Sequence, residues 1–191
     1  MKEVFSMNDK LLHKYAQLIV KTGLNIQKKQ TLVIFAPIEC ANFARMVAEI
    51  AYDEGAREVV IDWKDELSSK IRFLKAPDEI FDEFPDWKKE FYNFYANNGA
   101  AFLSIAASDP ELMKDVDPER ISRARKASNT ALIEYSERLM SNKNAWCVAS
   151  VPTVSWAKKV FPELDEDRAV EQLWEAILKS VRADKEDPVK A

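Results

Sequence analysis

The carboxylates Asp62, Asp65 and Glu66 are the side chains of this sequence best spaced to hold a metal ion. Three carboxylates this close together could bind a hard divalent cation through their oxygens. Adjacent acidic residues more often face solvent, so the same three residues are also compatible with a solvated turn. An independent enzyme built on this cluster would bind a divalent ion tightly without any further polypeptide.

The turn Ala36–Cys40 follows the first predicted strand, where nucleotide-binding α/β proteins place a glycine-rich loop. It contains no glycine, and Glu39 puts a negative charge where a phosphate would sit. A dinucleotide or P-loop site is therefore disfavoured. Asp62, at the end of the second strand, superficially resembles the ribose-binding acid of a nicotinamide enzyme, but without the glycines we expect a solvated carboxylate.

Nucleophilic catalysis by a thiol would need the single histidine, His13, beside Cys40 or Cys147. Neither cysteine has the flanking pattern of a known thiol enzyme, and each lies in an apolar stretch, so we expect buried, inert thiols. One histidine also excludes a His-rich metal centre within this chain. The sparse cysteines and the lack of a signal-peptide pattern predict a cytoplasmic protein.

Charged residues elsewhere form two runs. Arg120, Arg123, Arg125 and Lys126 lie on a predicted helix and are expected to be a solvated face, while the acidic run 165–167 suits the positive end of a helix. The whole chain has 28 Lys and Arg against 32 Asp and Glu, a net charge of -4, so nucleic acid is not an expected partner. With 47% hydrophobic and 31% charged residues, the composition is that of a soluble globular protein and predicts no membrane span.

The elements that must position these residues follow from apolar patterning. Continuous apolar runs typical of strands buried on both faces occur at 31–36, 100–106 and 146–151, and a further strand is predicted at 58–62. Apolar residues at helical spacing predict helices over 8–22, 39–54 and about 165–181. We therefore predict an α/β domain with a mainly parallel sheet of at least four strands in the order 2-1-3-4 and helices on both faces. The fold would be Rossmann-like without a nucleotide fingerprint.

Helix ends and an aromatic stripe complete this prediction. Asn8 is expected to cap the first helix and Gly23 to end it, and Gly55 is expected to be the left-handed C-cap of the second. Aromatic residues recur at spacings of three and four between residues 77 and 95, and we expect most of them to pack in a helical layer. A stripe this wide could also face a partner domain or subunit. The stripe comprises Phe84, Trp87, Phe91 and Tyr95, with Phe81, Tyr92 and Phe94 beside it.

The last residues predict the start of another helix, because Asp187 suits an N-cap and Pro188 suits the first helical position. The sequence stops before such a helix completes, and a helix that is nucleated without being propagated is unfavourable. We therefore expect residues 184–191 to begin a connection to a further domain.

Several motifs occur together, in this order, in one protein family. They are Tyr15–Asn25, Ala36–Glu39, Ala51–Ala56, Ser108–Pro110, Asp117–Arg120, Trp146–Thr153 and Trp156–Pro162. On these motifs the chain resembles the N-terminal part of the thermophilic-type metalloaminopeptidases, the family of aminopeptidases T, S and II. The resemblance runs from Met7 to the last residue and is most specific over 146–162. Residues 1–6 fall outside it, as an extension.

The resemblance implies an enzyme that removes N-terminal amino acids from peptides with two divalent metal ions, zinc or cobalt, held in a C-terminal half. Residues 7–183 would then be its N-terminal α/β domain, and residues 184–191 the start of the connection to a catalytic domain outside this chain. It implies a homodimer, and it places no catalytic, cofactor-binding or metal-binding residue within this sequence. The chain alone is expected to be inactive.

A stand-alone module of a different class remains the alternative. Such a module would lack catalysis and would use the crevice at the strand ends to bind a peptide or small ligand, or to support assembly. The interrupted helix at the C-terminus favours the partial enzyme over this module.

Overall fold

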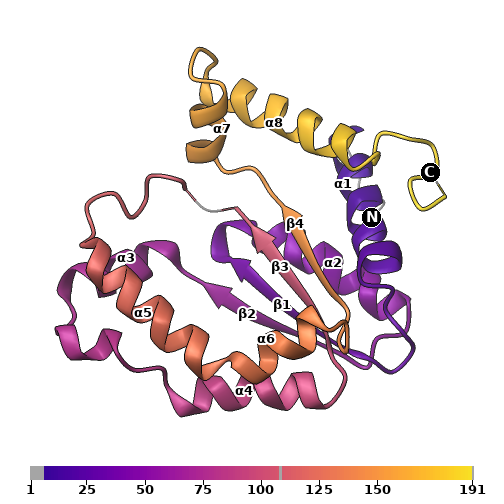
Figure 1. Cartoon of the computed structure of the whole chain (residues 1–191). Helices are drawn as coiled ribbons and strands as arrows, with labels where there is room; N and C mark the ends of the chain where they lie inside the picture. Colours follow the sequence, from indigo (N-terminus) through magenta and orange to yellow (C-terminus); the bar gives the residue numbers. More distant parts are fainter. Residues whose placement is uncertain (1–6, 108, 191) are drawn as a thin grey trace.

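Four parallel strands pair in the order β2-β1-β3-β4, as the sequence predicts (Figure 1). The computed structural model describes residues 7–107 and 109–190. Because the chain passes from β1 to β2 on one side and then crosses to β3 on the other, the winding direction reverses between β1 and β3. The strands are β1 (Thr31–Pro37), β2 (Glu58–Lys64), β3 (Ala101–Ala106) and β4 (Trp146–Ser150).

Helices cover both faces of the sheet (Figure 1). The first face packs against α1 (Met7–Leu18), the π-helical turn η1 (Ile19–Gly23), α2 (Ala41–Asp53) and α8 (Glu166–Ser180). The second packs against α4 (Asp86–Asn97) and α6 (Ile133–Met140). The remaining elements are η2 (Ile38–Cys40), α3 (Glu66–Lys75), η3 (Asp78–Phe81), α5 (Pro118–Ala131) and α7 (Val154–Val160). None of the helices in the described ranges is long and apolar enough to cross a membrane.

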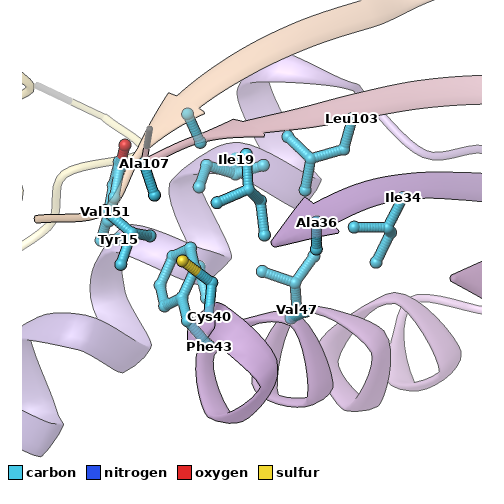
Figure 2. Close-up of a cluster of buried hydrophobic side chains, with 14 of the residues drawn as sticks. Tyr15, Ile19, Ile34, Ala36, Cys40, Phe43, Val47, Leu103, Ala107 and Val151 are labelled. Atoms are coloured by element: carbon cyan, nitrogen blue, oxygen red, sulfur yellow. The ribbon is translucent and has the colours of Figure 1, made fainter. Parts of the chain in front are cut away.

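Successive side chains of β1 point to opposite faces of the sheet, so the strand contributes to a hydrophobic core on each face. Ile34 and Ala36 point toward α2, where Phe43 and Val47 lie one helical turn apart on the same apolar stripe (Figure 2). All four side chains are buried. Full burial of an aliphatic or aromatic side chain contributes about 1.5–3 kcal/mol, so this face fixes the position of α2 on the sheet.

Aromatic rings form the core of the second face. The Phe35 ring stacks on Tyr92 at 5.2 Å, and Phe102 meets the edge of Tyr135 at 5.1 Å. The prediction of an aromatic helical layer is confirmed for those residues of α4 that contact the sheet, Phe91, Tyr92 and Tyr95. Trp87 and Phe94 point away from it, with 71% and 61% of their surfaces exposed.

The ends of the first two helices differ in part from expectation. Asn8 lies inside α1 rather than before it, so it is not the N-cap, and its side chain lies outside the described part of the structure. Gly55 adopts φ +91° after α2, which confirms the left-handed C-cap. Gly23 does not adopt a positive φ; it ends η1 where an added Cβ would stand 2.9 Å from the Cys147 sulfur. Close packing therefore explains this glycine.

One further prediction was wrong. The strand β4 is not buried on both faces, because it lies at the edge of the sheet and the helical layer of the second face ends at β3. Trp146 is consequently 41% exposed and Val148 56% exposed. At the C-terminus, residues 188–190 form a turn in which the Lys190 amide donates to the Asp187 carboxylate at 3.3 Å, the hydrogen bond expected of an N-cap at Asp187.

Candidate functional site

The three carboxylates of the predicted acidic cluster make separate local contacts and do not converge on one point. Asp65 is the N-cap of α3, where its carboxylate accepts from the Ser68 amide at 3.0 Å and from the Ser68 hydroxyl at 2.6 Å. These hydrogen bonds lower the pKa of Asp65. Glu66 accepts from the Asp109 amide at 3.4 Å, and Asp62 lies within β2 opposite Phe35.

No group of three or more His, Cys, Asp or Glu side chains is placed to hold a metal ion within residues 7–107 and 109–190. The described residues therefore do not fit a pair of divalent metals, at the acidic cluster or elsewhere.

The turn after β1 contains no glycine and does not have the geometry of a phosphate-binding loop. Pro37 is buried at the end of the strand, and η2 leads directly into α2. Glu39 is exposed in the first turn of η2, beside the positive end of α2. This arrangement presents a carboxylate where a phosphate-binding loop presents backbone amides.

The two thiols lie apart from the histidine. Cys40 is 4% exposed within the core, and burial, followed by the nearby Glu39 and Glu66, raises its pKa to about 11. Burial also raises the pKa of Cys147. His13 is exposed on α1, and no hydrogen bond joins it to either sulfur in the described parts of the chain. Cys40 is buried, as predicted, whereas Cys147 is only partly buried, and the raised pKa of each thiol disfavours the reactive thiolate.

Two of the four basic residues that were expected to form a solvated face, Arg120 and Arg123, instead make contacts that hold the fold together. Arg120 donates to the Phe73 carbonyl at 2.7 Å and pairs with Asp78 at 2.6 Å. Arg123 donates from Nε to Asp82 at 2.8 Å, which lowers the pKa of that carboxyl. These contacts tie α5 to the segment between α3 and α4.

The other two members of the run, Arg125 and Lys126, are exposed as predicted. Phe81, fully buried beneath the guanidinium of Arg120, is the centre of this small unit. The pattern of the sequence could not reveal these pairs, because the acidic partners lie on a different element.

The acidic run at 165–167 behaves as predicted. Asp165 caps α8 by accepting from the Arg168 amide at 3.0 Å, and Glu166 and Asp167 lie in the first turn, beside the positive end of the helix. The run therefore stabilises the start of α8.

A cleft lies at the carboxyl end of the sheet, where the stand-alone module was expected to bind a ligand, and sequence reasoning did not identify the residues that line it. Its volume is about 420 Å³, and its lining residues come from α3, the loop after β3 and α7. These three segments follow three different strands (Figure 1). Parallel α/β sheets bind ligands at this end. The lining is rich in lysine, comprising Lys70, Lys114, Lys158 and Lys159. No spacing in the sequence could indicate it, since the lysines come from separate segments.

The fold and this edge define a Rossmann-like α/β domain without a phosphate loop and without a metal-binding cluster of its own in the described residues. A family model described as thermophilic metalloprotease (M29) matches residues 8–191, and the chain belongs to this family.

Similar proteins agree with this assignment. The chain is 46% identical over 183 residues to aminopeptidase 2 of Geobacillus stearothermophilus and 39% identical over 180 residues to aminopeptidase AmpS of Bacillus subtilis. These matches cover 96% and 94% of this chain but only 44% of each relative. The solved structure of wild-type AmpT from Thermus thermophilus superposes with a TM-score of 0.85 at 35% identity, over 90% of this chain and 43% of that one. The chain thus spans less than half the length of the relatives it matches.

Proposed function

We propose that this chain is the N-terminal portion of a metal-dependent aminopeptidase that removes N-terminal amino acids from peptides. The observation that carries the proposal is the 46% identity to aminopeptidase 2 over 96% of this chain, together with the agreement in fold with AmpT. Both relatives have aminopeptidase names, and both are more than twice as long as the matched region.

The metal site belongs, in this proposal, to polypeptide outside this chain. The described residues do not gather ligands for a metal pair, which supports placing two divalent ions, zinc or cobalt, in a C-terminal catalytic domain. Residues 7–183 then form an α/β domain that walls the substrate cavity, and residues 184–191 lead into the connection to the catalytic domain. The assembled enzyme is a cytoplasmic homodimer in this proposal.

A chimera tests the proposal directly. Residues 7–190 would replace the matched region of the Geobacillus aminopeptidase 2, and hydrolysis of a leucine chromogenic amide would be measured with added zinc or cobalt. We expect activity in the chimera and none in the 191-residue chain or in the remainder of the relative alone. At 46% identity we expect the exchanged segment to dock on the remainder of the relative.

Two outcomes would contradict the proposal. A folded chimera with bound metal but no hydrolysis would favour the stand-alone binding or assembly module. Metal-dependent hydrolysis by the 191-residue chain would instead return the chemistry to Asp62, Asp65 and Glu66.

A further inference from the structure

We propose that the cleft between α3, the loop after β3 and α7 binds the carboxylate of a peptide, with Lys158 as its principal contact. The proposal rests on the proposed function for the class of ligand, a peptide. The site itself is argued from the positions of the lysines and of the groups that pair with them.

Lys158 presents a positive charge without a counter-ion. Its ammonium donates to the carbonyl of Pro162 at 2.8 Å and to the carbonyl of Leu164. No carboxylate lies within salt-bridge distance of it in the described ranges of the chain. Two of its three N–H groups are therefore used to hold the side chain in place, and the third remains for a ligand. Because the ammonium is already held in place, it loses little conformational entropy when it binds an anion.

The other lysines of the cleft are partly neutralised. Lys70 pairs with Asp115 at 3.3 Å, and Lys159 pairs with Glu111, which also lies 4.0 Å from Lys114.

Asp109 adds a further carboxylate to the lining. The lining itself places four lysines against two carboxylates, Asp109 and Glu111; beside it, Asp115 pairs with Lys70 and Glu66 accepts from the Asp109 amide. Four carboxylates thus surround the four lysines, and Lys158 is the lysine of the lining that no carboxylate of the described residues pairs. One unpaired ammonium suits a ligand with one negative charge, and the carboxylates would repel a dianion such as phosphate.

The rest of the lining suits a peptide. The hydroxyl of Ser155, exposed at the start of α7, is available as a hydrogen-bond donor, and Leu112 provides apolar surface. A volume of about 420 Å³ lies within the range that small-molecule sites occupy, so the end of a short peptide fits it.

Binding can be measured on this chain without any catalysis. Isothermal titration would compare the tripeptide Leu-Gly-Gly with its C-terminal amide, and would include inorganic phosphate as a separate anion. We expect the free acid to bind at least about tenfold more tightly than the amide, which is the effect of one charge-assisted hydrogen bond. Equal binding of acid and amide, or no binding of either, would overturn the proposal. Binding of phosphate alone would make the cleft a general anion site and would exclude the peptide.

Variants locate the binding. Lys158→Gln should weaken binding of the acid about tenfold, whereas Lys143→Gln, the same change in charge before β4 at the opposite end of the sheet, should leave it unaltered. Lys114→Gln, at an exposed lysine that holds no loop, should weaken it about twofold to threefold and carries the test if Lys158→Gln fails to fold. Equal losses in Lys143→Gln and the cleft variants would refute the location. Because catalysis is not measured, failure here leaves the chimera experiment unaffected.

Discussion

The hydroxyl of Tyr15 bridges the backbone of Ser150. It accepts from the Ser150 amide at 3.0 Å and donates to the Ser150 carbonyl at 3.4 Å. Tyr15 lies on α1 and Ser150 ends β4, the edge strand, so one side chain satisfies backbone groups that no neighbouring strand pairs. The contact also joins the first helix to the last strand of the sheet.

Removing this hydroxyl should destabilise the domain. Tyr15→Phe keeps the ring against Phe43 but leaves part-buried backbone groups unpaired, so we expect a loss of about 1–3 kcal/mol in the free energy of unfolding. Urea denaturation would measure it. Tyr95→Phe is the matched control, because the Tyr95 hydroxyl makes no hydrogen bond within the described structure. Equal losses in the two variants would show that the bridge contributes nothing.

Alkaline pH should unfold the protein through its buried tyrosines. Burial raises the pKa values of Tyr15, Tyr92 and Tyr135, that of Tyr92 from 10.0 to about 12. The unfolded chain therefore releases these protons first, and the stability that they contribute is complete below pH 10.0 and is lost as pH rises toward about 12. Urea midpoints measured across this interval should fall, and less steeply in Tyr92→Phe. A slope that is unchanged in Tyr92→Phe would contradict the assignment.

Gly23 should tolerate alanine only if Cys147 is made smaller. An added Cβ at Gly23 would stand 2.9 Å from the Cys147 sulfur, which a short side chain cannot move far. We expect Gly23→Ala to cost about 1–3 kcal/mol. In the double variant with Cys147→Ala most of this cost should disappear, and a double-mutant cycle from chemical denaturation would measure the coupling. Additive effects would mean that the sulfur is not the obstacle.

Arg120 should control local opening of the segment from α3 to η3. Its hydrogen bond to the Phe73 carbonyl and its position 5.3 Å from the centre of the Phe81 ring close this segment over α5. In Arg120→Met we expect amide hydrogen exchange in residues 66–82 to accelerate about tenfold, with the sheet unaffected. Arg125→Met, at an exposed position of the same helix, should exchange like the unaltered protein. Uniform acceleration across the sheet would instead indicate global destabilisation.

Regular patterns made some elements predictable from sequence. The apolar run of β1 was long enough to require burial on both faces, and the helix α8 had a capping Asp165 and a full apolar stripe. The strand order 2-1-3-4 was an expectation from the switch-point rule for doubly wound sheets, and the structure confirms it. The exposed face of β4 was not predictable, because Val148 has the same local pattern whether or not a helix covers it.

The sequence by itself determined the fold class, the family resemblance and the absence of a phosphate loop, and the structure was needed to establish the strand order. The first three properties depend on local periodicity and on residue types at fixed spacing, and both can be read from the sequence without any long-range contact. The tertiary structure alone decided that Arg120 holds α5 to Phe73, that Gly23 makes room for Cys147, and that Lys158 faces a cleft with lysines from other segments. Each of these depends on side chains distant along the chain, whose distances in space are set only when the sheet brings their elements together.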